Sequence, residues 1–288
     1  VEMKSRKGRL TYGVIMTILC VGIPMQVFPY IWILLSMFKA NKEVRAIPPT
    51  FFPNKWLWEN IPQTFAKYHL EQNILNSLLL CVGVILIQVT ISTLAAYALS
   101  KLKPKGSKWV MTFFLGTMMI NSQALAWPTY IMFTNFFGVR MIDNLWSLIL
   151  SFSAWAWAIF ILKSFFDSLP QDLLESARID GASSWQTLWH ITIPNVMPSI
   201  TICTFLTLTN GFKLFDQNLA LTGGLPSVIQ NGAKFNQTEL LALNIYSTYN
   251  INKNWHGVAQ AKAVIFFILV AVLAIAQQTA TRRKEVQQ

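Results

Sequence analysis

Charged residues are scarce in this chain. They make up 12% of its 288 residues, whereas a soluble globular domain carries about 25%. Hydrophobic residues account for 53% of the chain, and its mean hydropathy is +0.43. The scarcity of charge excludes a typical soluble domain and predicts an integral membrane protein.

Cysteine and histidine are also rare, and none lies at a spacing typical of a metal site or a catalytic site. Cys20, Cys81 and Cys203 each lie inside an apolar run, and no CxxC or Cys/His metal spacing occurs. We therefore expect them to be small buried hydrophobic side chains. The three histidines lie near no nucleophile that they could activate. The sequence predicts no catalytic residue, no bound metal and no cofactor on this chain.

Acidic residues are outnumbered, with 12 Asp and Glu against 23 Lys and Arg and a net charge of +11. Such a balance in a soluble chain would suggest nucleic acid, but the position of the charges argues against that partner. Basic residues cluster beside apolar runs, which is the positive-inside pattern of membrane proteins. We expect these clusters to lie in the cytoplasm against anionic lipid headgroups: Lys4, Arg6, Lys7 and Arg9; Lys101, Lys103, Lys105 and Lys108; Arg282, Arg283 and Lys284.

Several runs are long and apolar enough to cross the hydrocarbon layer, which takes about 20 residues. We expect an all-α membrane protein with six transmembrane helices, at Leu10–Phe38, Ile74–Leu99, Trp109–Phe133, Leu145–Leu162, Pro198 to about Leu221, and Val258–Gln278. An even number of spans puts both termini on the same side, here the cytoplasm. The inner loops are then Lys101–Lys108 and Lys163–Met197, and the outer loops are Ala40–Asn73, Thr134–Asn144 and Thr222–Gly257.

The first outer loop is rich in proline and aromatic residues, including Trp56 and Trp58. Aromatic side chains gather at membrane interfaces. They could also receive a soluble partner, and the sequence leaves both interpretations open.

One inner segment, Leu174–Pro198, is polar and lies between two apolar runs. Acidic residues favour the start of a helix, and Gly181 can end that helix with a positive φ. Ser183 or Ser184 can cap a second helix reaching about Thr192, which Pro194 and Pro198 then break. The segment predicts a helix–turn–helix with a polar face for a partner. Its apolar face toward the protein or lipid would comprise Leu173, Leu174, Trp185, Leu188 and Trp189. An amphipathic linker lying on the bilayer is the plain alternative.

The spacing within this segment resembles a known motif. Glu175-Ser176-Ala177, then Gly181, then Ile191-x-Ile193-Pro194 resembles the EAA loop of ABC importer permeases, which fits into a cleft of the ATPase subunit. Ser176 and Ile193 depart from the residues usual in that family, but every spacing holds. The resemblance implies that coupling to an ATPase rests on Glu175, Ser176, Ala177, Gly181, Ile191 and Pro194.

Over nearly its whole length the chain resembles carbohydrate-importing permeases of the maltose type. The resemblance rests on Asn76-Ser77, on the run Leu94–Ser100 and on Ala177–Ala182. It implies a MetI-like permease fold with cytoplasmic EAA coupling helices, divided into a tail, first span and outer loop (1–70), a core with the EAA loop at 167–197 (71–280), and a basic tail (281–288). It also implies a second permease subunit, two ATPase subunits that hold ATP and magnesium, and an external sugar-binding protein. The first half resembles the smaller maltose permease subunit and the second half the larger, so the place in a heterodimer stays open.

Polar residues inside spans usually face a cavity or a neighbouring helix. The candidates for a substrate path are Asn121, Gln123, Trp155, Asn210, Lys213 and Gln217. Lys213 and Asp216 are one helical turn apart and could instead pair with each other. Trp155 and Trp157 could stack on a sugar, or both could serve packing or lie at the membrane interface. Because they are two residues apart, we expect at most one to line the path.

These observations predict a permease subunit that imports a sugar or oligosaccharide by alternating access, through the bacterial cytoplasmic membrane. The chain lacks a GxxxxGK[ST] stretch for ATP phosphates, so hydrolysis is expected on partner chains. An ion-coupled secondary sugar transporter is the alternative. It should show inverted repeats, and no repeat is visible in the sequence.

Overall fold

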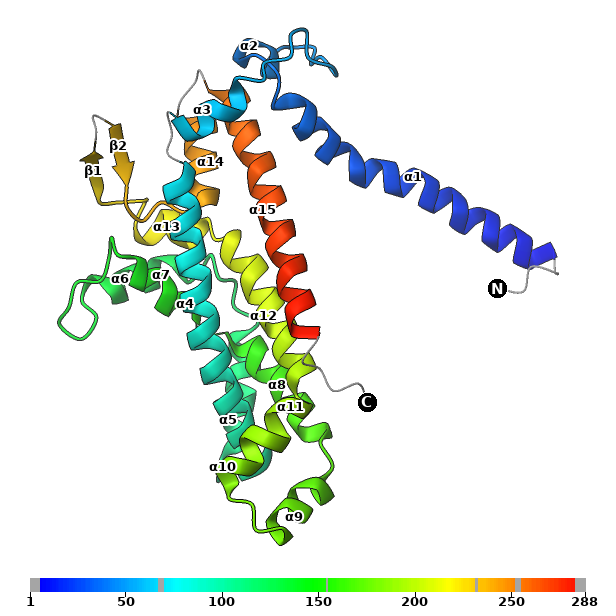
Figure 1. The fold of residues 1–288 in the computed structure, drawn as a ribbon, viewed down its shortest axis with the longest axis vertical. Helices are drawn as coiled ribbons and strands as arrows, with labels where there is room; N and C mark the ends of the chain where they lie inside the picture. The colour runs from blue at the N-terminus through cyan, green and yellow to red at the C-terminus, as the bar shows by residue number, and fades with distance from the viewer. Residues whose placement is uncertain (1–5, 67–69, 154, 231–232, 252–254, 283–288) are drawn as a thin grey trace. The chain divides into compact units, whose positions relative to one another are not determined.

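The computed structural model of the chain describes residues 6–66, 70–153, 155–230, 233–251 and 255–282 (Figure 1). The chain divides into two compact units, one of residues 1–69 and 245–267 and the other of 70–244 and 268–288. The first unit contains α1 (Arg6–Ser36), α2 (Asn41–Val44) and α3 (Asn60–Ala66). Two helices have parts in both units, α14 (Leu241–Asn250) and α15 (His256–Arg282). Arg283 and Lys284 of the basic tail lie outside the described residues.

The second unit holds most of the elements. It begins with α4 (Leu70–Tyr97), which continues as a π-helical turn, η1 (Ala98–Leu102). The elements that follow are α5 (Ser107–Thr117), α6 (Ala126–Thr134), α7 (Leu145–Ser153), α8 (Ala156–Ser168), α9 (Gln171–Ile179), α10 (Ser184–Thr187), the π-helical η2 (Leu188–Thr192), α11 (Ile193–Asn195), α12 (Met197–Phe212), α13 (Asp216–Leu221), β1 (Ser227–Gln230) and β2 (Ala233–Asn236).

Three helices within the described residues are long and apolar enough to cross a membrane: Thr11–Ser36, Leu70–Leu102 and His256–Thr281. Two bent pairs raise the number to five if each pair is one span, namely α7 with α8, bent by 41°, and Trp185–Asn195 with α12, bent by 69°. The expected span at Trp109–Phe133 is divided between α5 and α6. A turn separates them, in which the N–H of Ala124 donates to the Asn121 carbonyl. The count of six spans therefore stays a prediction.

The expected span from Pro198 to about Leu221 ends early. Helix α12 stops at Phe212, where the Lys213 N–H donates to the Asn210 carbonyl and the Leu214 N–H to the Gly211 carbonyl. A separate helix, α13, begins at Asp216. The expectation of one continuous helix through Asp216 is therefore wrong. The chain turns directly after Gly211, a residue that weakens a helix.

In the first unit a buried lysine organises the loop that follows α1, the expected outer loop. The Lys39 side chain is 1% exposed, donates a hydrogen bond to the Thr50 carbonyl and places its Nζ 4.3 Å from the centre of the Trp32 ring. Burial lowers the pKa of Lys39, although the nearby Glu43 carboxylate opposes that shift. Glu43 also accepts hydrogen bonds from the Thr50 hydroxyl and the Asn54 N–H. These contacts hold the loop that follows α1 in one defined conformation.

The second unit is built around α4, which packs against α7, α8 and α12. Gly211 lets α4 and α12 approach closely, because a Cβ there would lie 2.9 Å from the Cys81 Sγ. Deeper in this interface the Gln88 side chain donates to the Thr207 hydroxyl at 2.9 Å, and both residues are 1% exposed. Such buried polar contacts join helices where water is absent. Cys81 and Cys203 are buried, as expected, whereas Cys20 is exposed.

A small antiparallel hairpin interrupts the otherwise helical fold. Strand β1 pairs with β2, with Ser227 opposite Asn236 and Gln230 opposite Ala233. Asn218, fully buried, donates to the Thr238 carbonyl and accepts from the Leu240 N–H. The expected outer loop at 222–257 is therefore structured where it is described, and it contains strands that the sequence did not predict.

Candidate substrate pathway and coupling segment

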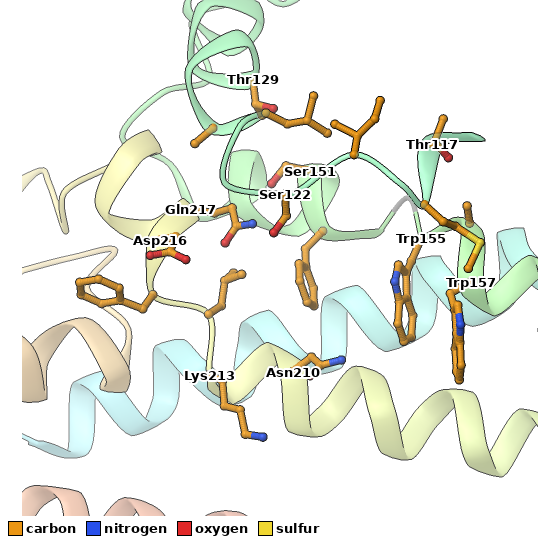
Figure 2. Close-up of a pocket in the computed structure, with 18 of the residues that line it drawn as sticks. Thr117, Ser122, Thr129, Ser151, Trp155, Trp157, Asn210, Lys213, Asp216 and Gln217 are labelled. Atoms are coloured by element: carbon orange, nitrogen blue, oxygen red, sulfur yellow. The ribbon is translucent and has the colours of Figure 1, made fainter. Parts of the chain in front are cut away.

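A cavity of about 700 Å³ opens within the second unit. Four stretches of chain form its wall: the end of α5 with the turn before α6, the start of α6, the junction of α7 and α8, and the end of α12 with the start of α13 (Figure 2). We call it the central pocket. Its polar lining consists of Thr117, Ser122, Thr129, Ser151, Asn210, Lys213, Asp216 and Gln217, and its aromatic lining of Phe152, Trp155, Trp157 and Phe215.

Both Trp155 and Trp157 line the central pocket, which contradicts the expectation that at most one would do so. Their rings stack with centres 5.5 Å apart and planes 26° apart. The reason lies in the backbone, because Trp155 precedes α8 in an extended conformation with φ −123° and ψ 104°. In extended chain, residues two apart point to the same side. The break before α8 therefore brings both indoles to one wall.

Asp216 is paired with an amide and not with a lysine. The Gln123 amide donates to the Asp216 carboxylate at 3.0 Å, although 93 residues separate them along the chain. In the described part of the chain no ion pair joins Lys213 to Asp216, and Figure 2 shows the Lys213 side chain directed away from that carboxylate. The proposed pairing of Lys213 with Asp216 assumed a continuous helix, and α12 ends before Lys213.

The structure brings together most of the residues named as path candidates. Trp155, Asn210, Lys213 and Gln217 line the central pocket. Gln123 joins it through Asp216. Asn121 does not belong to the wall, and its side-chain oxygen accepts the N–H of Gln123 within the turn.

Sequence reasoning missed several hydroxyl groups of the pocket wall, those of Thr117, Thr129 and Ser151. Ser and Thr are a weak signal in apolar runs because they can bond to their own helix. Ser151, for example, donates to the Leu148 carbonyl at 3.1 Å. Only the packing of α5, α6 and α7 shows that these hydroxyls share one cavity.

The coupling segment, defined here as residues 170–196, forms the predicted helix–turn–helix at the end of the second unit near α5 (Figure 1). Helix α9 ends at Ile179, and Gly181 follows with φ +80°. The N–H of Ala182 donates to the Ala177 carbonyl at 2.9 Å. This bond and the left-handed glycine form a Schellman-type helix end. The prediction that Gly181 ends the first helix with a positive φ is therefore confirmed.

Of the two serines proposed as cap of the second helix, Ser183 has that role. Its hydroxyl accepts the Gln186 N–H at 3.3 Å, and the Gln186 side chain accepts the Ser183 N–H at 2.8 Å. This reciprocal pair is a capping box. The second helix continues through η2 and α11 to Asn195, beyond the expected end near Thr192. The break falls at Val196, with φ −99° and ψ 7°.

The surface of the coupling segment combines polar and apolar residues. Glu175, Ser176 and Gly181 are exposed, Ala177 is 5% exposed, and Ile191 and Pro194 are half-buried. Of the expected apolar face toward protein or lipid, Trp185 and Trp189 are 65% and 52% exposed and pack on each other with ring centres 5.7 Å apart, and Leu173 is also exposed; that face stays a prediction. Leu188 alone of that set is buried. The outward surface of the segment therefore includes large apolar side chains, as a surface for a protein partner would.

Comparison with known proteins shows what this fold belongs to. Residues 88–286 match the family of binding-protein-dependent transport system inner membrane components. A probable starch degradation products transport system permease protein of Thermoanaerobacterium thermosulfurigenes is 38% identical over 154 residues, which are 54% of this chain and 47% of that protein. The chain thus spans about half the length of that relative.

A second relative matches over more of the length. It is an sn-glycerol-3-phosphate transport system permease protein of Yersinia enterocolitica, 25% identical over 285 residues, with 96% of both chains covered. Among solved structures, a chain of a bacterial ABC transporter involved in the import of the acidic polysaccharide alginate superimposes with a TM-score of 0.79. It is 18% identical and covers 97% of this chain and 99% of its own.

These matches confirm the expected permease fold and the resemblance to sugar-importer permeases. The family is one of inner membrane components, and the apolar helices described above are those of a bacterial multi-pass membrane protein. With more than half of its length matched, the chain belongs to the binding-protein-dependent transport system inner membrane component family.

Proposed function

We propose that this chain is the permease subunit of an ATP-driven importer that moves a sugar or oligosaccharide across the bacterial cytoplasmic membrane by alternating access. The observation that carries the proposal is the coupling segment, whose Glu175 is exposed on α9 beside a turn fixed by Gly181. A helix pair with such a surface can receive a rigid-body motion from a soluble partner. Glu175, Ser176, Ala177, Gly181, Ile191 and Pro194 form this coupling site in the proposal.

The lining of the central pocket supports a carbohydrate substrate. Amides and hydroxyls supply donors and acceptors for sugar hydroxyls, and the stacked Trp155 and Trp157 offer an apolar surface for a ring. The Asp216 carboxylate lies in the wall, while the Lys213 side chain is directed away from it (Figure 2). A neutral sugar suits this lining better than a phosphate ester, since the described lining has one ammonium, Lys213, and one carboxylate, Asp216, and so no net positive charge for a phosphate. The starch-product relative agrees with this choice.

The proposal includes partners and an orientation. A second permease subunit completes the pathway, and two ATPase subunits hold ATP and magnesium. A sugar-binding protein delivers the substrate outside, in keeping with the binding protein in the name of the family. Both termini and the coupling segment lie in the cytoplasm because of the positive-inside rule. The chain itself is a transport subunit and not an enzyme.

The proposal is tested by purifying the chain with the products of its neighbouring genes and measuring sugar uptake into proteoliposomes. We expect an ATPase to co-purify and uptake to require ATP. Glu175→Lys should abolish uptake, whereas Glu59→Lys, a matched change at an exposed residue of the outer loop, should leave uptake unchanged. Uptake driven by an ion gradient alone, with no ATPase attached, would overturn the proposal in favour of a secondary transporter.

A further inference from the structure

The inner ends of α4 and α8 meet at a small polar cluster that the coupling motif does not include. The Ser100 hydroxyl donates to Asp167 Oδ1 at 2.5 Å, and Lys163 Nζ lies 2.5 Å from Asp167 Oδ2. Lys101 Nζ donates to the Leu169 carbonyl at 3.2 Å. We call Ser100, Lys101, Lys163 and Asp167 the inner latch. All its members lie in the second unit.

Burial distinguishes the inner latch from an ordinary surface ion pair. Lys163 and Asp167 alone, four residues apart on one helix and partly exposed, would contribute little to stability. Ser100, however, is 1% exposed. Its hydrogen bond therefore has a buried donor, although the Asp167 side chain that accepts it is 43% exposed, and hydrogen bonds to an ionised carboxylate are roughly twice as strong as those between neutral groups.

The backbone beneath the inner latch is also unusual. Ser100 and Lys101 both belong to η1, where α4 changes from α-helical to π-helical. This turn ends at Lys103, which adopts a left-handed conformation with φ +43°. The η1 turn stands at the C-terminal end of α4, where π-turns occur, and the Lys103 N–H closes it by donating to the Ala98 carbonyl at 3.0 Å. This turn sets the positions of Ser100 and Lys101 at the inner end of α4.

The inner latch lies at the start of the coupling segment, and both ends of that segment share an apolar cluster with the inner end of α4. Leu169 caps the end of α8 directly before the segment, and Val196 ends it. Both side chains are buried in the same apolar cluster as Ala96 and Leu99 of α4 and η1. The segment therefore starts and finishes against the inner end of α4, and the inner latch supplies the polar bonds at its start.

The opposite end of α4 is also bonded, to the loop after the hairpin. Asn73 and Asn76 donate to the carbonyls of Glu239 and Gln237 at 2.9 and 2.8 Å, and the Ser77 hydroxyl accepts the Leu241 N–H at 2.9 Å. Helix α4 has 28 residues, which corresponds to about 42 Å at 1.5 Å per residue. It thus joins the inner latch to the 237–241 stretch across the thickness of a membrane.

We propose that the inner latch is a positioning contact that fixes the coupling segment to α4, so that a motion imposed on the segment moves α4 and the 237–241 stretch with it. Asp167 acts through Ser100 and touches no substrate. This role rests on the proposed function, because it requires an ATPase to move the segment. It adds residues outside the EAA-like motif to the coupling machinery.

The test compares Ser100→Ala, Asp167→Ala and the double variant in the complete transporter. We expect the sugar transported per ATP hydrolysed to fall about fivefold or more, which is the usual lower range for coupling between sites. The double variant should resemble either single variant, because all three lose the same bond. Hydrogen exchange of the amides in residues 170–180 should become faster in each. Ser168→Ala is the matched control, since its hydroxyl bonds only within its own helix, to the Phe165 carbonyl.

The outcomes separate the two proposals. Wild-type exchange and wild-type transport per ATP in the Ser100→Ala and Asp167→Ala variants, or losses that simply add in the double variant, would overturn the inner latch alone. A wild-type complex that shows no ATP-dependent uptake would overturn the proposed function and with it the coupling role of the latch. Faster exchange combined with unchanged transport per ATP would also overturn the latch, because the contact would then be structural only.

Discussion

The coupling segment and the central pocket are assembled in opposite ways. Each turn of the coupling segment is set by neighbours in the sequence, such as the bond from the Ala182 N–H to the Ala177 carbonyl and the capping of Gln186 by Ser183. The pocket instead depends on contacts between distant residues, such as Gln123 with Asp216. The same chain thus builds one site from local backbone geometry and the other from packing.

This difference predicts how the two sites respond to substitution. A change in the coupling segment should act on the backbone, so its effect should be large and should depend little on the rest of the fold. A change in the pocket removes one contact among many, so its effect should be graded. The predictions below test that contrast, beginning with the largest expected effect.

Gly181→Pro should abolish sugar uptake. Gly181 has φ +80°, whereas proline fixes φ near −65°, so the turn between α9 and α10 could not form. The protein should still insert into the membrane, because the spans are untouched. Uptake into proteoliposomes and the amount of subunit in the membrane fraction measure the two effects.

Gly138→Pro serves as the control. Gly138 also has a positive φ, of +86°, and nothing lies within 4 Å of the position that its Cβ would take. It belongs to the expected outer loop at 134–144, away from the coupling segment in the sequence. Equal losses in both variants would show that the effect reflects a general folding defect, and the contrast drawn above would be wrong.

The same contrast explains what the sequence could predict. The sequence predicted two short helices, a turn at Gly181 and a cap at Ser183 or Ser184. Each prediction used residues within one or two helical turns of each other, and the structure confirms the turn and places the cap at Ser183. The long apolar spans of α1, α4 and α15 also followed from composition. In each case the signal and the structure lie in the same short stretch.

The pocket was predicted less well, because the residues that line it depend on where α12 ends and where α8 begins. The end of α12 at Phe212 rotates Lys213 away from Asp216, and the extended residue Trp155 brings Trp157 to the same wall. In the sequence the first break is marked by the single glycine Gly211, and the second by neither proline nor glycine. Four of the six path candidates line the pocket, but which residues they contact depended on how α5, α6 and α12 pack.

Gly211→Ala should destabilise the protein by about 1–3 kcal/mol, the usual cost of overpacking. The new Cβ would lie 2.9 Å from the Cys81 Sγ, at the close approach of α4 and α12 beside the pocket residue Asn210. Thermal unfolding in detergent measures the loss. Adding Cys81→Ala should restore stability by removing the sulfur. Gly116→Ala, where nothing lies within 4 Å, should cost nothing, and an equal loss there would refute the packing explanation.

Trp155→Ala and Trp157→Ala should each lower the efficiency of sugar uptake about tenfold. Aromatic contacts of this kind contribute up to about 1.5 kcal/mol beyond the area they bury, and 1.4 kcal/mol corresponds to a factor of ten. Initial uptake rates at low sugar concentration measure the effect. Trp109→Ala, at a side chain that is 80% exposed and outside the pocket, should have no effect. Unchanged rates in both pocket variants would remove the stacked pair from the substrate path.

The smallest expected effect is the coupling energy between Asp216 and its partner, and measuring it identifies that partner. A double-mutant cycle of Gln123→Ala with Asp216→Ala should give a coupling energy of about 0.5–1 kcal/mol, since the bond is exposed and involves a charged group. The cycle of Lys213→Ala with Asp216→Ala should give about zero. Both cycles are measured by unfolding in detergent. If the coupling were found with Lys213 instead, α12 would continue past Phe212 as the sequence suggests, and the pocket wall would be helical where the structure has a turn.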